Sequence, residues 1–392
     1  MTLYIPKPVT STTFPLFQDG DPGTADAVVS LGVPYVGPDV TIRALFDALE
    51  WLKQGGGDDL SKHHRITLAK ACARSAWSET EQSWYACGQP GAGAGLMRSQ
   101  DAGRSWTDIT AACGAAGELL DLTVSTAGTV VCLALGTRTA YVGVPSSYGA
   151  LSGGGAWTAS ANALGAVPTT ASVDYEPTAG NFVTLYRVGA TGFRAEYDPD
   201  GIAPWTAALL PAAWSGYTGS KNAEIACRAG HAVGVFFDDG GAPARYRIIR
   251  SSSGGSSWAE TTITPASFAP DELCKPVYSA VLGAWFFSGT KTAPPTGTEI
   301  FRSTDDGATW TSIAVLPSGL LFRSLAVLGP LLVAVHSDGR LFVSVDGVSW
   351  TFMTAYPVTT GKPFLRAGGG GLLALSPSDT WAAATLRFPG RA

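Results

Sequence analysis

Short apolar runs separated by glycine- and proline-rich turns dominate the chain from about residue 60 to its end. Typical runs are residues 83–87, 182–186, 233–237 and 284–287, all rich in aromatic and β-branched side chains. Runs this short, with turn-forming residues on both sides, are typical of β-strands rather than helices. The pattern predicts an all-β fold.

A polar motif of the form S-x-D-x-G-x-[ST]-W recurs between these runs. Its two complete copies and one shortened copy contain, in order, Ser99, Asp101, Gly103 and Trp106; Ser303, Asp305, Gly307 and Trp310; and Ser344, Asp346, Gly347 and Trp350. A weaker copy at residues 251–258 has serine in place of the aspartate, and two degenerate copies end at Trp157 and Trp205. A motif that returns this often marks a repeat architecture.

The spacing of the motif gives the size of the repeat. Subtracting the positions of successive motif tryptophans (106, 157, 205, 258, 310 and 350) gives 51, 48, 53, 52 and 40 residues. A four-stranded propeller blade takes roughly 40–50 residues. Two more strands follow Trp350, and residues 65–71 could supply the strand that closes the ring, which would leave no exposed sheet edge. The sequence predicts a seven-bladed β-propeller, with six or eight blades as the alternatives.

The motif resembles the Asp-box (BNR) repeat of sialidases and related propellers. The same box occurs in plant cell-wall glucanases, sorting receptors, a photosystem assembly factor and bacteriophage tail proteins, so the resemblance implies a fold more strongly than a function. Its aspartate can accept backbone N–H groups in a tight turn, its glycine can adopt a positive φ, and its tryptophan can be buried. We therefore interpret the box residues as structural, because catalysis needs one site and not several copies.

The first 58 residues predict a separate attachment segment. Residues 1–38 are rich in proline, glycine and threonine and predict an extended arm. Residues 39–54 predict one helix, whose apolar face is formed by Ile42, Leu45, Phe46, Leu49 and Leu52. This face could pack on the propeller at residues 59–392, on copies of itself in a homo-oligomer, or on a larger assembly.

Composition and charge exclude several classes of function. The net charge is −5 and there is no basic stripe, which argues against nucleic-acid binding. The start lacks the features of a signal peptide, and the longest apolar run, residues 325–335, is too short for a membrane helix. The six cysteines are scattered and predict buried free thiols, and the four histidines have no ligand-spaced partners, so no metal site and no cofactor are expected.

Candidate chemistry is sparse. A sialidase-like site would need clustered arginines and a nucleophile/base pair; Arg194, Arg245, Arg247 and Arg323 are available, but Tyr175 and Glu176 are adjacent and would point to opposite faces of a strand. Loop acids that could serve a glycosidase are Asp238, Asp239, Asp271 and Glu272. No catalytic residue is predicted. The aromatic loop at residues 211–221 provides two candidate binding residues, Trp214 and Tyr217.

The function predicted from this architecture is that of a non-enzymatic virion protein made in the host cytoplasm. The sub-classes that fit are a bacteriophage tail fibre, a receptor-binding protein, and a collar or baseplate appendage. Residues 1–58 would bind other virion proteins, and the propeller would present a rigid surface to a host glycan or protein. The alternatives are a sialidase-like glycoside hydrolase or lyase acting on surface polysaccharide, and a cellular scaffold with a protein partner.

Overall fold

A computed structural model describes most of the chain after residue 67. The described residues are 68, 72–88, 95–101, 103–115, 118–145, 157–189, 192–202, 204–211, 223–238, 245–264, 272–291, 297–316, 320–355, 363–368, 371–375 and 384–387. The predicted arm and helix in residues 1–58, and the candidate binding residues Trp214 and Tyr217, lie outside these ranges.

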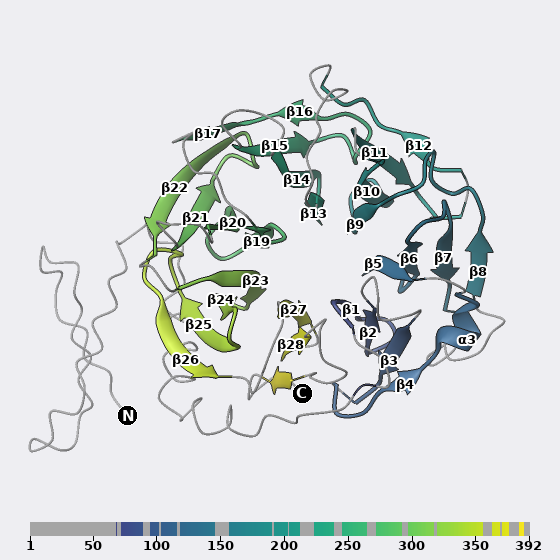
Figure 1. Ribbon diagram of the computed structural model, residues 1–392, viewed down its shortest axis with the longest axis horizontal. Coiled ribbons are helices and arrows are strands. Elements are labelled where there is room, and N and C mark those ends of the chain that lie inside the picture. Colours follow the sequence, from purple (N-terminus) through teal and green to yellow (C-terminus); the bar gives the residue numbers. More distant parts are fainter. Residues whose placement is uncertain are drawn as a thin grey trace, which may run out of the picture.

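The described strands form seven sheets arranged in a ring (Figure 1). We use the term blade for the six sheets that have at least four strands. Blades 1 to 3 comprise β1 (Arg74–Ser78), β2 (Ser83–Cys87), β3 (Leu96–Ser99) and β4 (Thr107–Asp108); β5 (Leu119–Val124), β6 (Val130–Ala134), β7 (Ala140–Gly143) and β8 (Trp157–Ser160); and β9 (Thr170–Glu176), β10 (Asn181–Arg187), β11 (Phe193–Asp198) and β12 (Thr206–Ala207).

The second half of the ring has a similar order. Blades 4 to 6 comprise β13 (Ala223–Arg228), β14 (His231–Asp238), β15 (Arg245–Ser251) and β16 (Ala259–Glu260); β17 (Thr262–Thr264), β18 (Glu272–Leu273), β19 (Val277–Ser279), β20 (Ala284–Lys291), β21 (Gly297–Ser303) and β22 (Thr309–Val315); and β23 (Phe322–Leu328), β24 (Leu331–His336), β25 (Arg340–Ser344) and β26 (Thr351–Ala355). The last sheet comprises β27 (Phe364–Gly368), β28 (Gly371–Leu375) and β29 (Ala384–Arg387).

Most neighbouring strands within a sheet follow each other in sequence and are antiparallel, as tight turns between them require. There are two exceptions. β18 pairs with β20 and not with β19, and β17 pairs in parallel with β22 and so ties the end of blade 4 to the outer edge of blade 5. The only helix of the described chain is α3 (Thr110–Cys113), a single turn that ends at Gly114 with a positive φ of 71°. Within the described residues, no helix has the length and apolar character needed to cross a membrane.

The all-β propeller predicted from the sequence is confirmed, but the preferred number of seven complete blades is corrected to six. Among the described residues the sheet of β27, β28 and β29 has three strands. The fourth strand expected at residues 65–71 lies outside the described residues, apart from Leu68. Leu68 is buried in a cluster with Leu373 and Leu375 of β28. Six blades is one of the alternatives that the spacing allowed.

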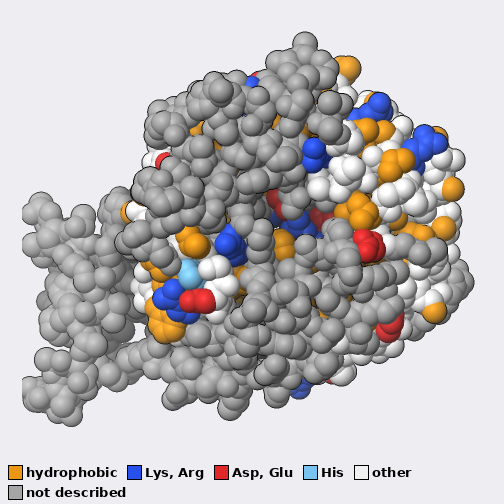
Figure 2. Space-filling view, viewed as in Figure 1, with side chains coloured by type: hydrophobic (Ala, Val, Ile, Leu, Met, Phe, Trp, Pro, Cys, Tyr) orange, Lys and Arg blue, Asp and Glu red, His pale blue; other side chains and the backbone are white. Residues whose placement is uncertain are grey.

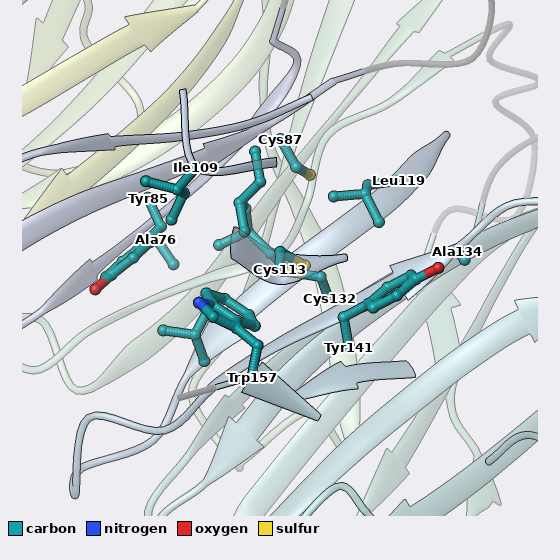
Figure 3. Packing of buried hydrophobic residues seen from close by; sticks show 13 residues of the cluster. Ala76, Tyr85, Cys87, Ile109, Cys113, Leu119, Cys132, Ala134, Tyr141 and Trp157 are labelled. Atoms are coloured by element: carbon teal, nitrogen blue, oxygen red, sulfur yellow. The ribbon is translucent and has the colours of Figure 1, made fainter. Parts of the chain in front are cut away.

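The apolar core is divided into layers between neighbouring sheets. Seven clusters of buried side chains each combine residues from two adjacent sheets. Figure 3 shows the cluster between blades 1 and 2, in which Tyr85 and Ile109 of blade 1 pack near Trp157 and Cys132 of blade 2. Strands buried on both faces explain why the sequence shows short apolar runs rather than strict alternation of polar and apolar residues.

The repeated motif builds the turn between the third and fourth strands of a blade. In blade 5 the carboxylate of Asp305 accepts hydrogen bonds from the backbone N–H and the hydroxyl of Thr309, at 2.8 and 2.6 Å. The Ser303 hydroxyl donates to Asp305 at 2.8 Å and accepts the N–H of Gly307 at 2.8 Å. The indole N–H of Trp310 then donates to the carbonyl of Gly307 at 3.1 Å. Residues 99–106 make the same set of bonds in blade 1.

The glycine of the motif sits against the preceding sheet. Gly307 has a φ of 81°, and a Cβ atom there would lie 2.9 Å from Val233 of blade 4. Gly347 has a φ of 78°, and a Cβ atom there would lie 2.8 Å from Phe286 of blade 5. Both the positive φ and the close approach exclude a side chain. Each motif turn therefore docks its own blade onto the one before it.

The motif tryptophan completes the same contact between sheets. Trp258 packs with residues of β10, Trp310 with residues of β14, and Trp350 lies 4.9 Å from the ring of Phe322 in the cluster between blades 5 and 6. Trp106 of blade 1 packs with Leu373 and Leu375 of the last sheet. The first blade and the last sheet are thus in contact, and among the described residues this apolar contact closes the ring.

One degenerate copy of the motif gives a test of pH dependence. Asp198 is 3% exposed, accepts the N–H groups of Asp200 and Gly201, and has its pKa raised to about 6, first by burial and then by Asp200. A group whose pKa is raised in the folded state stabilises the fold at low pH. This contribution to the free energy of unfolding is lost as the pH rises from about 4, the pKa of the group in the unfolded chain, to about 6. Asp198→Asn should match the wild-type melting temperature at pH 4.5 and exceed it by roughly 2 °C at pH 7.5.

Thermal unfolding followed by circular dichroism at the two pH values measures this difference. Asp305→Asn is the matched control, because hydrogen bonds from Thr309 and Ser303 outweigh burial and lower the pKa of Asp305. That variant should be less stable than the wild type at both pH values. A constant difference between Asp198→Asn and the wild type across this pH range would contradict the assignment.

The cysteines are free thiols, as the sequence predicts, and five of the six are buried. Burial raises the pKa of Cys113 and of Cys274 to about 12 each. Because the thiolate is the reactive form, neither residue should react with iodoacetamide in the folded protein at pH 8, and both should react in denaturant. Intact mass and peptide mapping measure the labelling, and fast labelling of the native protein at either position would contradict the packing.

Candidate functional site

A pocket of about 310 Å³ lies at the axis of the ring. All seven sheets contribute to its lining, and the residues come almost entirely from the strands nearest the axis: β1, β5, β9, β13, β19, β23 and β27 (Figure 1). Basic and acidic side chains are both visible in the hollow at the centre of the face shown in Figure 2. The lining contains four bases, Arg74, Arg228, Lys275 and Arg366, and two acids, Asp121 and Asp174.

Asp121 of β5 is held by protein donors on every side. Its carboxylate accepts the Ser172 hydroxyl at 2.9 Å and the backbone N–H groups of Val173 and Leu122 at 3.0 and 2.9 Å. Burial by itself would raise the pKa of Asp121, but Lys275, Arg74 and the two backbone N–H groups together hold it below its usual value. Asp121 is therefore a buried carboxylate that stays ionised.

Asp174 of β9 occupies the corresponding place one blade further along the ring. It accepts the Thr123 hydroxyl at 3.1 Å from β5 and the backbone N–H of Cys227 at 2.9 Å from β13. Asp121 links blade 2 to blade 3, and Asp174 links blades 2, 3 and 4. The two acids thus fasten neighbouring blades where the strands converge on the axis.

Three bases reach across the axis to acids on the opposite side. Arg74 of blade 1 forms a buried ion pair with Glu224 of blade 4. Burial opposes the charge on Arg74, but Glu224 and Asp121 outweigh it and raise the pKa of the guanidinium. This pair closes part of the ring centre with opposite charges instead of apolar side chains.

Lys275 and Arg366 make the other two contacts across the axis. The Nζ atom of Lys275, in the segment before β19, lies 3.2 Å from the carbonyl oxygen of Val173 and 3.7 Å from the carboxylate of Asp121. Arg366 of β27 lies 3.5 Å from the carboxylate of Asp174. The acids therefore come from three consecutive blades (2, 3 and 4), and these bases come from blade 5, the last sheet and blade 1.

Arg228 of β13 is arranged differently, at the edge of an aromatic pair. Its guanidinium carbon lies 4.5 Å above the ring centre of Tyr278, and a terminal nitrogen is paired with Asp306. The ring of Trp285 lies 5.3 Å from that of Tyr278. The Nε of Arg228 and the indole Nε1 of Trp285 are buried and have no hydrogen-bond partner among the described residues.

Bases and acids differ in how far solvent can reach them. The side chains of Arg366 and Arg228 are 30% and 24% exposed, whereas that of Asp121 is 3% exposed. Both acids accept hydrogen bonds from groups of the protein itself, whereas the side chains of Arg366 and Arg228 remain partly exposed. The pocket is therefore suited to holding an anion by charge, and its carboxylates are not placed to donate protons.

The residues singled out from the sequence as candidate chemistry do not form this pocket. None of Arg194, Arg245, Arg247 and Arg323 lines it. Glu176 uses its carboxylate to accept backbone N–H groups of Thr178, Ala179 and Gly230, at 2.7–2.8 Å, and the ring of Tyr175 packs 5.1 Å from that of Phe182. Asp239 and Asp271 lie outside the described residues. Across the described chain, no group of three or more histidine, cysteine or acidic side chains is placed to hold a metal ion.

Comparisons with known proteins support the fold and nothing finer. No family model matches the chain, and no curated protein matches it. Among solved structures, YCF48 from Cyanidioschyzon merolae aligns over 83% of this chain and 97% of its own with a TM-score of 0.55 and 11% identity. Virginiamycin B lyase from Staphylococcus aureus aligns over 83% and 98% with a TM-score of 0.57 and 14% identity. The fold is a β-propeller. At this identity the likeness carries no activity from either protein to this chain.

Proposed function

We propose that this chain is a non-enzymatic adhesion protein of a virion, in which the propeller presents the axial pocket to a host surface glycan. In this proposal the repeated motif is an Asp box that serves the fold, and residues 1–58 attach the propeller to other virion proteins. A bacteriophage tail fibre, a receptor-binding protein and a collar or baseplate appendage are the settings that suit such a chain. The attachment segment and propeller expected from the sequence support the virion setting, and the axial pocket supports the binding of a glycan.

The observation that carries the proposal is the state of the acids in the pocket. A glycoside hydrolase needs one carboxylic acid that is protonated and a second carboxylate that is free to act as base or nucleophile. Asp121 is kept ionised by Lys275, Arg74 and backbone N–H groups, and Asp174 is occupied by donors from blades 2 and 4. Both acids serve the structure, so the pocket favours binding without turnover.

One experiment separates binding from catalysis. Purified full-length protein is applied to an array of sialylated, uronate-containing and neutral bacterial surface glycans, and each bound glycan is then incubated with the protein and assayed for new reducing ends. We expect retention of one class of glycan with no reducing ends above the protein-free control. Turnover of any glycan would replace this proposal with the glycosidase alternative, and a failure to retain every glycan class would overturn adhesion to a glycan.

A further inference from the structure

We propose that the axial pocket binds the carboxylate of a hexuronic acid unit within an acidic glycan, with Arg366 and Arg228 as the groups that hold the carboxylate. This inference rests on the proposed glycan adhesion and names the ligand class and the residues for it. It is carried by three features of the pocket: open basic groups, unsatisfied buried N–H groups beside aromatic rings, and a size that fits one sugar ring.

The open bases point to an anionic ligand. The pocket is lined by four bases and two acids. Arg74 and Arg228 are also paired with Glu224 and Asp306, which do not line the pocket, so these two acids offset part of the positive charge of the lining. Asp121 and Asp174 are satisfied within the protein, whereas the contact of Arg366 with Asp174 is long, at 3.5 Å. A ligand carboxylate could draw Arg366 into a shorter, charge-assisted pair without breaking the bonds that hold Asp174 to blades 2 and 4.

The second feature is the set of unsatisfied donors around Tyr278. The Nε of Arg228 and the Nε1 of Trp285 are buried and have no partner among the described residues. Trp285 is fully buried and also lines the pocket, together with Tyr278 and Phe364. Both donor atoms are closed to solvent, so a ligand oxygen reaches them only when neighbouring side chains move apart, and that contact would then relieve the cost of a buried donor without an acceptor. Arg228 covers one face of the Tyr278 ring and Arg74 one face of the Phe364 ring, so only their opposite faces are left for the apolar face of a sugar ring.

Size and charge favour a uronate over other anions. A pocket of about 310 Å³ is at the small end of the range for ligand sites, which is about 300–1,000 Å³, and accommodates one ring rather than a folded peptide. Asp121 remains an ionised neighbour of the pocket, so a singly charged carboxylate is repelled less than a doubly charged phosphate group. The chemistry that fits is one carboxylate on one polar ring.

Titration of the full-length protein with four small probes tests the inference. The probes are sodium glucuronate, glucose, inorganic phosphate and the N-acetylated dipeptide of glycine, and binding is measured by ligand-observed NMR at pH 7 and low salt. We expect glucuronate to bind at least about tenfold more tightly than each of the other three, because only it combines the charge with the ring. Tighter binding of the dipeptide or of phosphate would overturn the sugar assignment.

Variants locate the site. Arg366→Gln and Arg228→Gln should each weaken glucuronate binding by about tenfold or more, with an unchanged melting temperature as the check on folding. Arg340→Gln is the matched control: Arg340 is paired with Asp338, is 39% exposed, does not line the pocket, and its loss should leave binding unchanged. If both pocket variants fold and bind glucuronate as the wild type does, this inference fails.

The failure of this inference can be told apart from the failure of the proposed function. A protein that is retained on a glycan array, but whose retention is neither competed by glucuronate nor reduced by Arg366→Gln, is an adhesin that uses another surface. A protein retained by no glycan overturns both proposals. Retention of uronate-containing glycans that is lost in both pocket variants and kept in Arg340→Gln supports both.

Discussion

Replacing Trp310 by alanine should lower the free energy of unfolding by about 4 kcal/mol, the usual range for a large aromatic residue removed from a packed core. Trp310 is 1% exposed and packs with Val233 and Val235 of blade 4, and its ring centre lies 4.9 Å from that of Phe287. The substitution leaves a cavity in the apolar layer between blades 4 and 5 and removes the indole hydrogen bond to Gly307. Chemical denaturation followed by tryptophan fluorescence and circular dichroism measures the loss.

Val315→Ala is the control from the same strand. Val315 ends β22, as Trp310 lies near its start, but it is 72% exposed, so its truncation should cost no more than about 0.5 kcal/mol. A loss below about 1 kcal/mol for Trp310→Ala would mean that the motif tryptophan does not hold neighbouring blades together. The difference between the two variants measures the docking of one blade onto the next.

The fold could be predicted from the sequence because its signals are local and repeated. The turn of the motif is made within eight residues, as between Ser303 and Trp310, and the spacing of successive tryptophans reports the size of a blade. The complete number of strands could not be predicted in the same way. The last sheet has no motif copy of its own after Trp350, and its closure depends on contacts with residues distant in sequence such as Leu68.

The pocket could not be predicted because each of its charged residues is isolated in the sequence. Arg74 and Glu224 are 150 residues apart, and the ring places them together. The arginines that the sequence offers as candidates, Arg194, Arg245, Arg247 and Arg323, do not line the pocket. One feature of the sequence does point to the pocket: Asp121 and Asp174 both lie inside apolar strands, and their separation of 53 residues is within the range of the blade repeat.

The equivalent positions of Asp121 and Asp174 in consecutive blades explain how the two acids stabilise the ring. An acid at the same place in consecutive blades meets the backbone N–H of the next blade, as Asp121 does with Val173 and Asp174 with Cys227. Strands near the axis crowd together and expose N–H groups that their own sheets leave unpaired, and a buried acceptor must satisfy them. The buried acids at the centre of the ring therefore serve first to accept these backbone N–H groups. The proposed binding uses the bases that remain partly exposed, Arg366 and Arg228.

Breaking the buried pair between Arg74 and Glu224 should be the second large effect. The two side chains are 12% and 3% exposed, and Glu224→Ala would leave the Arg74 guanidinium buried beside an empty site. Removing one partner of a buried pair costs about 3–5 kcal/mol, because the remaining charge is uncompensated. Arg74→Met should cost a similar amount, since the carboxylate of Glu224 would then be the unpaired charge, and its Oε2 atom already lacks a partner among the described residues.

The double variant distinguishes an ion pair from simple packing. With Arg74→Met and Glu224→Ala combined, neither charge of this pair remains buried, so the loss of stability should be smaller than the sum of the two single losses by at least about 2 kcal/mol. The exposed pair Arg340–Asp338, 39% and 51% exposed, serves as the comparison and should show a coupling below about 1 kcal/mol. Additive losses for Arg74 and Glu224 would show that blades 1 and 4 are not joined by charge across the axis, and that the ring is closed by its apolar layers alone.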